Sequence, residues 1–561
     1  MAGLSLSHNM LGIGIADRLM SRAGGAPNRA VTDATTHQVW VAGTEAFMHW
    51  RDGFVLAGGL TVAACGSGTS PTQPPVADVA FTTQPPASVE GNVAIAPAVR
   101  VTIRDASGNL VPTGTVTMSI GTVPWPAPGS RLLGTLTVSA NNGVATFADL
   151  RVDKPGAAYT LTAASGAARA SSTPFDVRLT FTSLAAGGLH TCGLTTGGTY
   201  CWGTNIYGQL GGATGAVIAD SVPILVSSPT PFTQTVGGEQ HSCALTSTGA
   251  VFCWGHNDQD ELGDGTTNGP DQCPGAQTLL VECHDGPVQV AGSGIAPLAF
   301  TSLTSGPLAS HTCGLTDAGV AYCWGYNYSG QLGDSGTTNR SAPVQVVGSG
   351  TAPLLFTALS AGGVHTCGVT ADNAVYCWGL GPLGDSTITE SHAPLHVTGS
   401  GTAPLRFTAV TARRLHSCGL TTDGAVYCWG SDAQGQLGDG TTTSSSTPVQ
   451  VAGSGAAPLV FTSVRGGDIH TCGVTMVGAI YCWGFNGNGE LGDGTTTNRA
   501  TPVQVAGSGT ATLIFTAVTA GEGHSCGLTV DHAVYCWGYG SDGELGNGTR
   551  NNHLTPIPIV Q

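Results

Sequence analysis

Residues 416–430 read His416-Ser417-Cys418-Gly419-Leu420-Thr421-Thr422-Asp423-Gly424-Ala425-Val426-Tyr427-Cys428-Trp429-Gly430, and the chain repeats this stretch. Near-copies carry further cysteine pairs, which are Cys192 with Cys201, Cys243 with Cys253, Cys313 with Cys323, Cys367 with Cys377, Cys472 with Cys482 and Cys526 with Cys536. From one first cysteine to the next the steps are 51, 70, 54, 51, 54 and 54 residues. Seven units of this length, rich in Gly and β-branched residues, predict a β-propeller.

The repeated stretch is predicted to fold as a β-hairpin. A three-residue loop, Thr422-Asp423-Gly424, places Gly where such loops need a left-handed residue. This register sets Cys418 opposite Cys428, and side-chain alternation puts both sulfurs on one face. In the first copy the cysteines are one residue closer, so a two-residue turn at Thr196-Gly197 keeps them opposed. Directly opposed cysteines are close enough for a disulfide.

Each unit adds one strand before the hairpin and one after it. In the clearest copy these strands are Phe407-Thr408-Ala409-Val410 and Pro448-Val449-Gln450-Val451. A turn-rich loop with Gly-Gln-Leu-Gly, or a close variant, connects the hairpin to the last strand. We therefore expect an all-β fold, a seven-bladed propeller of four-stranded blades over residues 179–561.

The phrase Cys-Gly-Leu-Thr…Val-Tyr-Cys-Trp-Gly…Gly-Gln-Leu-Gly-Asp-Gly-Thr resembles the regulator-of-chromosome-condensation repeat, in the cysteine-paired form of secreted bacterial proteins. The resemblance implies a seven-bladed propeller closed by joining its two chain ends. The array begins with Leu179-Thr180-Phe181 and finishes with Ile557-Pro558-Ile559-Val560. We expect these two ends to lie in or beside the same blade.

Charge and cysteine usage limit the function classes. The formal net charge is −16 and only 9% of the residues are charged, which argues against binding to a phosphate backbone. Of the 17 cysteines, fourteen belong to the hairpin pairs, and Cys273 with Cys283 forms an eighth pair at the same ten-residue spacing. Locally matched pairs indicate disulfides made in an oxidising compartment. Reduced, buried cysteines are the alternative.

The N-terminal region predicts export. An apolar run from Gly53 to Ala64 is too short to span a bilayer but suits a signal-peptide core. Val62-Ala63-Ala64-Cys65-Gly66 resembles the lipobox of bacterial lipoproteins, which would make Cys65 the lipidated first residue. We expect residues 1–64 to be an upstream segment and signal, with Met48 as a candidate for the true start; a plain secretory signal is the alternative. Residues 65–78 then form a Gly/Ser/Pro linker.

Residues 79–178 predict a second domain. Five stretches alternate as strands, beginning at Val99, Thr115, Gly134, Val144 and Tyr159. About 100 residues of short strands favour a β-sandwich. Phe81-Thr82-Thr83-Gln84-Pro85-Pro86 and Val101-Thr102-Ile103-Arg104-Asp105-Ala106-Ser107-Gly108-Asn109 resemble bacterial immunoglobulin-like surface modules. That resemblance implies a spacer or adhesive module.

Four patterns could carry chemistry, and a structural role is favoured for each. His416, Cys418 and Cys428 resemble three zinc ligands, but seven identical sites are implausible in an exported protein; a histidine bonded to the neighbouring blade's backbone is preferred. Ser525 lies in a Gly-x-Ser-x-Gly match with no helix after it, against catalysis. The Gly-Asp-Gly-Thr loops suggest turn-capping aspartates rather than calcium, at Asp264, Asp439 and Asp493. One tryptophan per unit predicts packing. We expect no metal, no cofactor and no catalytic residue.

Partner binding is predicted at the loops after the tryptophans, where the repeat varies. The candidate contact residues are aromatic or polar: Tyr207, His256, Asp258, Tyr326, Tyr328, Asp432, Phe485 and Tyr539. The second unit also carries an insertion around residues 268–285, pinned by Cys273 and Cys283. Structured insertions on rigid scaffolds often bind.

The leading hypothesis is a non-enzymatic scaffold outside the cytoplasm, lipid-anchored in the bacterial envelope or secreted. It would be a monomer that binds an unidentified protein, touches a membrane only through its anchor and binds no nucleic acid. Two alternatives remain open. One is an exchange-factor-like regulator of a small GTPase, which the family resemblance implies; the other is a propeller-based enzyme acting on cell-envelope polymers.

Overall fold

The computed structural model describes residues 73–125, 128–212, 218–267, 271–274, 280–296, 298–348, 354–386, 390–398, 405–453, 458–510 and 513–561. Met48, the apolar run and Cys65 lie outside these ranges, as does most of the linker. Within the described ranges no helical segment has the length and apolarity that crossing a bilayer requires.

Residues 78–178 form two main sheets around one hydrophobic core. One sheet has the order β1-β3-β7: β1 (Asp78–Thr83), β3 (Val99–Arg104) and β7 (Val144–Phe147). The other has the order β2-β11-β9-β4-β6: β2 (Ser88–Glu90), β11 (Phe175–Arg178), β9 (Gly156–Ser165), β4 (Thr115–Thr122) and β6 (Thr137–Ser139). In addition, β10 (Ala168–Ser171) pairs with β9, and β5 (Leu132–Leu133) and β8 (Arg151–Val152) form a separate two-stranded sheet. Alternating side chains of both sheets, such as Val101, Phe147 and Leu161, fill the core.

Among the described residues after Arg178, seven further sheets follow, each with four strands paired in chain order as an antiparallel meander; the second sheet has an additional strand. All seven first strands begin with Phe: β12 (Phe181–Ala186), β16 (Phe232–Gly237), β21 (Phe300–Thr304), β25 (Phe356–Ala361), β29 (Phe407–Ala412), β33 (Phe461–Gly466) and β37 (Phe515–Ala520). All second strands begin with His: β13 (His190–Thr195), β17 (His241–Thr246), β22 (His311–Thr316), β26 (His365–Thr370), β30 (His416–Thr421), β34 (His470–Thr475) and β38 (His524–Thr529).

The outer half of each sheet comes from the tryptophan strand and the last strand of the unit. The third strands are β14 (Gly198–Thr204), β18 (Val251–His256), β23 (Ala321–Gly325), β27 (Val375–Gly379), β31 (Val426–Gly430), β35 (Ile480–Gly484) and β39 (Val534–Gly538). The fourth strands are β15 (Ala219–Leu225), β20 (Leu280–Gln289), β24 (Arg340–Gln345), β28 (Ser391–His396), β32 (Ser445–Gln450), β36 (Arg499–Gln504) and β40 (His553–Pro558). In the second sheet, β19 (Asp271–Pro274) pairs with β20 as a fifth strand.

The predicted hairpin register is confirmed. Cys418 lies opposite Cys428, Gly419 opposite Tyr427 and Leu420 opposite Val426. In the first sheet Thr195 pairs with Gly198, so the two-residue turn at Thr196-Gly197 keeps the cysteines opposed. Gly424 has φ +81°, which fits the left-handed position assigned to it.

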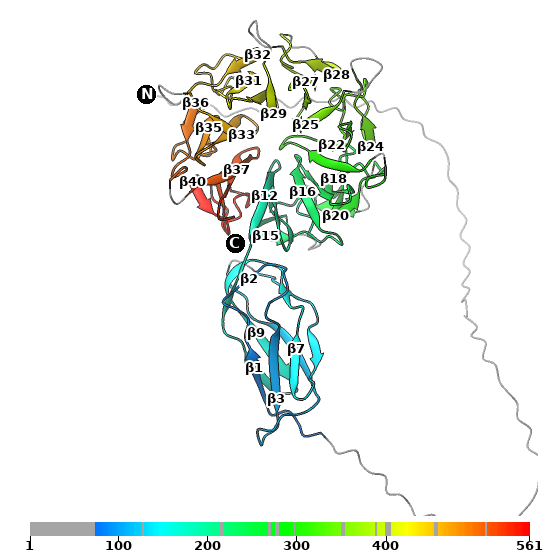
Figure 1. The fold of residues 1–561 in the computed structure, drawn as a ribbon, viewed down its shortest axis with the longest axis vertical. Helices are drawn as coiled ribbons and strands as arrows, with labels where there is room; N and C mark the ends of the chain where they lie inside the picture. Colours follow the sequence, from blue (N-terminus) through cyan, green and yellow to red (C-terminus); the bar gives the residue numbers. More distant parts are fainter. Residues whose placement is uncertain are drawn as a thin grey trace, which may run out of the picture. The chain divides into compact units, whose positions relative to one another are not determined.

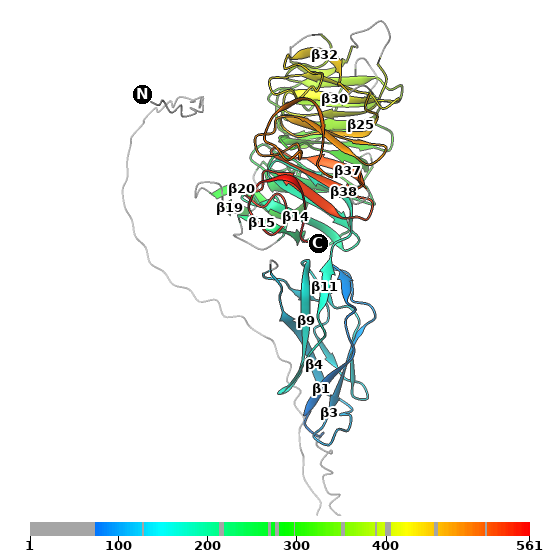
Figure 2. The same ribbon diagram turned by 90° about the vertical axis from the view of Figure 1, so that its left-hand side faces the viewer.

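The seven sheets are arranged around a common centre (Figure 1). Each first strand contacts the first strands of the two neighbouring sheets, including β37 against β12. In the side view the strands β25, β30, β37 and β38 run across the thickness of this ring, so the connecting loops gather at its two ends (Figure 2). The start and the finish of the array meet, as predicted: Leu179 and Phe181 of the first sheet share a hydrophobic cluster with Ile559, which follows β40.

Seven hydrophobic clusters fill the ring, one at each boundary between consecutive sheets. The cluster between the fifth and sixth sheets joins Cys418, Leu420 and Cys428 to Phe461 and Trp483. Each sheet therefore buries one face against the sheet before it and the other against the sheet after it. This explains why both faces of the repeat are apolar or small.

Candidate functional site

The second strands place a buried histidine at every boundary between sheets. Its Nε2 atom lies 2.7–3.0 Å from a Ser or Thr hydroxyl of the next sheet, in the pairs His190–Ser242, His241–Thr312, His311–Thr366, His365–Ser417, His416–Thr471, His470–Ser525 and His524–Thr191. The predicted partner was the neighbouring backbone; the structure shows a neighbouring side chain instead. The last pair joins the seventh sheet to the first and closes the set.

Hydrogen bonding fixes the tautomer of four of these histidines. At four boundaries the hydroxyl donates its single proton to a loop carbonyl: Ser242 to Gln209, Thr366 to Gln331, Thr471 to Gln436 and Ser525 to Glu490. The hydroxyl must then accept from a protonated Nε2. All seven Nδ1 atoms are buried without a hydrogen-bond partner. Burial lowers the pKa values of His190 and His470 to about 3, so these rings are neutral in the folded protein.

These contacts give the tryptophans and Ser525 structural roles. All seven tryptophans of the repeat are fully buried, which confirms their packing role. Trp483 donates from Nε1 to the Gln436 carbonyl at 3.0 Å, the same carbonyl that accepts from Thr471. Ser525 is fully buried, and its hydroxyl donates to the backbone carbonyl of Glu490. The short distance from Ser525 to His470 therefore does not make the serine a nucleophile.

Disulfides join all eight of the expected cysteine pairs. The seven pairs of the repeat are Cys192 with Cys201, Cys243 with Cys253, Cys313 with Cys323, Cys367 with Cys377, Cys418 with Cys428, Cys472 with Cys482, and Cys526 with Cys536. Their Cα atoms are 4.0–4.1 Å apart, and all fourteen residues are fully buried. The eighth bridge joins Cys273 to Cys283 within the insertion of the second unit.

The bridges and the turn geometry argue against the two metal readings of the repeat. Bonded sulfurs offer no thiolate for zinc, so the pairing of histidine and cysteine in the second strand is not a zinc site. The Gly-Asp-Gly-Thr aspartates cap their turns, since Asp264, Asp439 and Asp493 accept from the backbone N–H two residues on. Both patterns therefore have structural explanations.

Variable residues of the repeat gather at one end of the ring, which we call the loop face. It consists of the loops between first and second strands together with the residues directly after the third strands; the loops are 187–189, 238–240, 305–310, 362–364, 413–415, 467–469 and 521–523. Backbone hydrogen bonds tie the two sets together. Tyr326 donates to Ser310, Phe485 to Ile469, and Tyr539 to Gly523, at 2.7–2.9 Å.

A groove of about 340 Å³ lies on the loop face where the sixth, seventh and first sheets meet. Its apolar lining includes Leu189, Ile469, Phe485 and Tyr539; its acidic lining is Asp468, Glu490 and Glu522. Two of the predicted contact residues, Phe485 and Tyr539, therefore share one groove. Aromatic rings beside carboxylates fit a partner that presents basic and apolar side chains.

Asp468 and Glu490 in the groove have raised pKa values. Burial raises the pKa of Asp468 to about 6, against the opposing pull of Arg414. The Arg414 guanidinium lies 3.6 Å from the Asp468 carboxylate. Burial also raises the pKa of Glu490. Their ionisation is therefore less favourable than at the open surface.

The other predicted contact residues fall into two groups. Tyr328 is 74% exposed, and its ring stacks on Tyr326 with centroids 6.5 Å apart. Tyr207 is half-buried, with its ring centroid 4.6 Å from that of His256. Asp258 is exposed. These positions present side chains at the loop face.

His256 and Asp432 are buried and are not surface contacts. Asp432 accepts from the Leu437 N–H at 2.8 Å, as Asn486 does from Leu491, so it shapes the loop. The Nδ1 atom of His256 lies 3.2 Å from Glu261 and 3.1 Å from Asp258. Among the described residues this trio is one of two groups with ligand atoms close enough for a metal; the other contains the bonded Cys273 and Cys283. The same distances suit ion pairs of His256 with Asp258 and Glu261, and the expectation of no metal stays a prediction.

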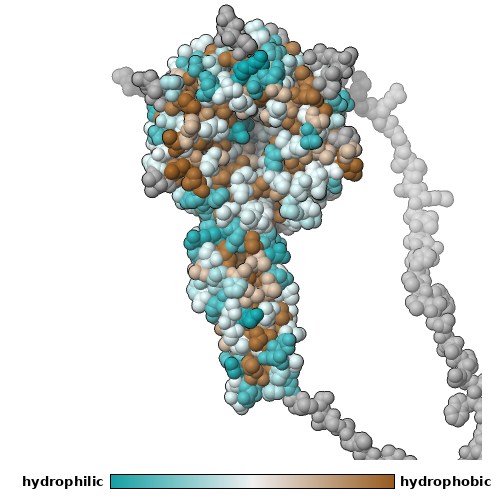
Figure 3. Space-filling model, in the orientation of Figure 1, coloured by the Kyte–Doolittle hydropathy of each residue, from teal (hydrophilic) through white to brown (hydrophobic). Residues whose placement is uncertain are grey.

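The end of the ring opposite the loop face also exposes apolar side chains. It carries the hairpin turns, where Met476 is 78% exposed and Val477 70% exposed. Figure 3 shows hydrophobic surface over the sheets of β35 and β37 on the face it displays. Sequence reasoning did not single out this surface, nor the loop acids Glu239, Asp468 and Glu522. The signal was present, because these acids stand at a position that holds Gly188 and Gly363 in other units.

Comparisons with known proteins identify the repeat. Residues 299–561 match the family model of the RCC1-like domain, and residues 181–209 and 232–260 match a model of the regulator of chromosome condensation (RCC1) repeat. A second RCC1-repeat model matches residues 196–245. This chain carries an RCC1-repeat propeller. Its four-stranded blades are the sheets described above.

Relatives of the RCC1-repeat propeller differ in total length. The ultraviolet-B receptor UVR8 of Arabidopsis thaliana is 26% identical over 370 residues, which are 65% of this chain and 78% of that protein. The human E3 ubiquitin-protein ligase HERC2 is 29% identical over 379 residues, 66% of this chain but only 7% of that protein.

Solved structures share the fold at low identity. Prp20p of Saccharomyces cerevisiae, described together with its binding to Gsp1p and histones, has a TM-score of 0.54 at 20% identity, covering 68% of this chain and 87% of that one. Human WBSCR16 has a TM-score of 0.51 at 20% identity, covering 73% and 97%. These likenesses concern the propeller fold alone.

Proposed function

We propose that this protein is a non-enzymatic interaction scaffold that binds another protein through its loop face. The observation that carries the proposal is the groove of Phe485 and Tyr539 with Asp468, Glu490 and Glu522. Glu490 belongs to the repeated frame, as Glu261 and Glu544 do, whereas Phe485, Tyr539, Asp468 and Glu522 stand at positions that vary between units. Variable aromatic and charged side chains on rigid loops are the usual material of a protein-binding surface.

The charge of the groove defines the partner's chemistry. Three carboxylates and a net charge of −16 favour a basic protein surface over a nucleic acid. Exposed Tyr328 and half-buried Tyr539 supply flat, amphipathic contact area at low entropic cost. Protein partners of relatives such as Prp20p give this mode a precedent within the fold.

The cellular setting is also part of the proposal. We infer a seven-bladed propeller raised on an immunoglobulin-like spacer and exported, either anchored through a lipid at Cys65 or secreted, and monomeric. Eight disulfides are compatible with an extracellular protein, because cytosolic thiols are normally kept reduced. The two-sheet domain with its single core supports the spacer role.

An exchange-factor role has weaker support. It rests on a fold likeness at 20% identity, which carries no binding specificity by itself. An enzyme acting on envelope polymers has no observation in its favour: the Ser–His contacts of the described residues are repeated structural bonds. The scaffold is therefore preferred.

The test compares two faces of the same protein. Phe485→Ser with Tyr539→Ser alters the groove, and Ser431 already occupies the Phe485 position in the fifth unit. Met476→Ser with Val477→Ser alters the exposed hairpin end and is the matched control. Partners cross-linked at the surface of producing cells are identified, and their affinities are measured for all three proteins.

We expect the groove variant to weaken binding at least about tenfold, with the control unchanged. Equal binding by the wild type and the groove variant would remove the groove from the interface. Loss only in the hairpin-end control would move the interface to the opposite face.

A further inference from the structure

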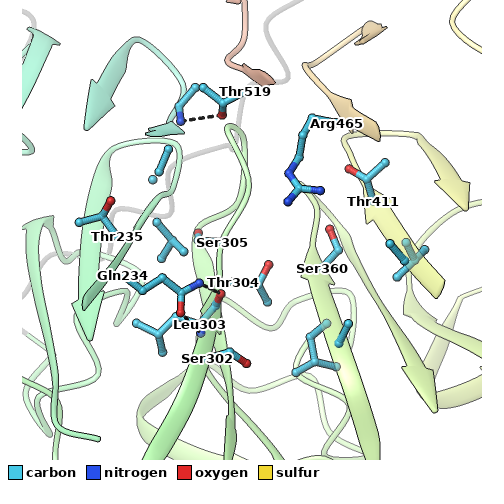
Figure 4. A pocket seen from close by; sticks show the side chains of 18 of the residues that line it. Gln234, Thr235, Ser302, Leu303, Thr304, Ser305, Ser360, Thr411, Arg465 and Thr519 are labelled. Atoms are coloured by element: carbon cyan, nitrogen blue, oxygen red, sulfur yellow. Dashed lines mark hydrogen bonds between the residues drawn. The ribbon is translucent and has the colours of Figure 1, made fainter. Parts of the chain in front are cut away.

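The seven first strands enclose a central cavity of about 370 Å³. The fourth residue after each strand's phenylalanine occupies one equivalent position of the lining: Ala185, Val236, Thr304, Ser360, Thr411, Arg465 and Thr519. Four of the seven are hydroxyl residues and one is an arginine. Figure 4 shows the Arg465 guanidinium pointing into this cavity, with Ser360 below it in the view.

The hydroxyls of this lining retain donor capacity. Thr304, Ser360 and Thr519 accept backbone N–H bonds at 2.9–3.2 Å from Ala361, Ala412 and Ala186 of the next sheet. Each hydroxyl uses a lone pair in that bond and keeps its own proton. Thr411 Oγ1 is buried with no hydrogen-bond partner.

A second arginine reaches the same cavity from the fifth sheet. Arg413 lines the cavity two residues after Thr411, where the other six units all have glycine: Gly187, Gly238, Gly306, Gly362, Gly467 and Gly521. Its side chain passes Gly466, where an added Cβ would lie 2.6 Å from Arg413 Cγ. An added Cβ at Gly306 would lie 3.5 Å from its Nη1 atom. The side chain thus extends across the end of the cavity toward the third sheet.

Neither arginine has a carboxylate partner in the described part of the chain. Arg413 is only 8% exposed, and its Nε atom has no hydrogen-bond partner. Burial, with a contribution from Arg465, lowers the pKa of Arg413 to about 9, which still leaves it charged at neutral pH. Arg465 is exposed to the cavity and donates to the Val464 carbonyl at 3.0 Å, so a buried and an exposed guanidinium share one cavity without a counter-ion among the described residues, and they repel each other.

We propose that the cavity is a binding site for a small oxyanion of the phosphate or sulfate class, held by Arg413, Arg465 and the hydroxyls of Ser360 and Thr411. Guanidinium groups match the paired oxygens of such anions, and hydroxyls donate to the remaining ones. Larger polyanions are disfavoured because Glu239, Asp468 and Glu522 lie on the surrounding loop face. The site does not depend on the proposed protein partner.

The experiment uses variants that restore the repeat. Arg413→Gly inserts the glycine of the other six units, and Arg465→Thr inserts the threonine of the seventh. The control is Arg414→Gly, which removes an exposed arginine of the same loop and leaves the cavity unchanged. Binding of radiolabelled inorganic phosphate and of radiolabelled sulfate to the full chain is measured by equilibrium dialysis at constant ionic strength.

We expect the wild type and Arg414→Gly to bind one anion per chain, and the double variant to bind at least about tenfold more weakly. The melting temperature should rise with the anion in the first two proteins, beyond the general salt effect retained by the double variant. No saturable binding to the wild type, or equal binding by wild type and double variant, would overturn the proposal. If the double variant does not fold, Arg465→Thr alone provides the same comparison, and unchanged binding to it would overturn the proposal.

Discussion

The boundaries between sheets and the loop face are built from the same repeat but use it in opposite ways. At a boundary, the buried histidine, tryptophan and cysteine pair recur seven times, and the histidine bonds to a neighbouring hydroxyl every time; five of the tryptophans donate to a loop carbonyl, whereas Trp324 and Trp429 do not. On the loop face, the residue two after each tryptophan changes from Thr204 to Tyr326 to Leu380. The comparison teaches that recurrence marks the frame, whereas departures from the repeat mark the places where function is to be sought.

Hydrogen bonding accounts for the recurrence of polar residues at the boundaries. One loop carbonyl accepts from both a tryptophan and a hydroxyl, and that hydroxyl also accepts from a histidine. Removing any member leaves a buried polar group unpaired. Tyr328 on the loop face is not held in such a buried network, because most of its ring is exposed.

The largest predicted contrast comes from one tryptophan and one tyrosine. Trp483→Ala should cost about 3–5 kcal/mol in unfolding free energy, because it empties the boundary between the fifth and sixth sheets and leaves Gln436 with one donor fewer. Tyr328→Ala should stay within about 0.5 kcal/mol of the wild type. Urea unfolding measures both. Similar losses for the two variants would erase the distinction between frame and loop face.

The repeat disulfides should come next in size. Replacing Cys472 and Cys482 together by Ala should cost about 2.5–3 kcal/mol in the chain-entropy model, since the bridge closes a ten-residue separation. Losing the bridge between Cys273 and Cys283, which lies outside the repeat, should leave the ring's midpoint of unfolding almost unchanged. Denaturation of the two double variants, each against the wild type, makes the comparison.

A smaller, pH-dependent effect is expected at Glu544. Burial raises its pKa from 4.5 to about 8, so the folded chain holds a proton that the unfolded chain releases. Stability from this group is therefore fully present below pH 4.5, is lost as the pH rises from 4.5 to about 8, and does not change further above that. Glu544→Gln, which installs the residue found at Gln209, Gln331 and Gln436, should stabilise the protein at pH 9 by on the order of 2 kcal/mol.

The same substitution should have little effect at pH 5, where Glu544 is already neutral. Urea titrations of wild type and variant at the two pH values provide the measurement. A gain of equal size at both would show that the benefit is not due to the charge.

Repetition is what made most of the fold predictable. The spacing of Cys418 and Cys428 fixed the hairpin register, and Gly424 fixed its turn. The first residue of the fourth strand was predicted less accurately. Pro448 was expected to begin it, but the strand begins at Ser445, because a bulge after Cys428 pairs Gly430 with Ser445. Proline has no backbone N–H to donate to a β-ladder, so the sequence contained no evidence that the strand begins before Pro448.

Contacts between units could not be predicted from patterns within one unit. The hydroxyl partner of His416 lies 55 residues away, at Thr471, and no spacing rule within one unit indicates it. Asp432 was predicted to be a surface residue because its position varies, yet Asp432 and its counterpart Asn486 accept equivalent loop N–H groups, those of Leu437 and Leu491. Arg413 was recognisable in principle, as the one residue other than glycine in its column of the repeat.

Histidine NMR tests the central claim, that identical neutral histidine–hydroxyl bonds close every boundary of the ring. Each of the seven buried rings should remain a neutral Nε2–H tautomer from pH 7 to pH 5, because burial holds its pKa near 3 or 4. Nitrogen chemical shifts in the folded protein report both the tautomer and its titration. Seven unprotonated Nδ1 signals that do not move over this range are the predicted result. Any of these rings titrating near pH 6.5, or carrying its proton on Nδ1, would contradict it.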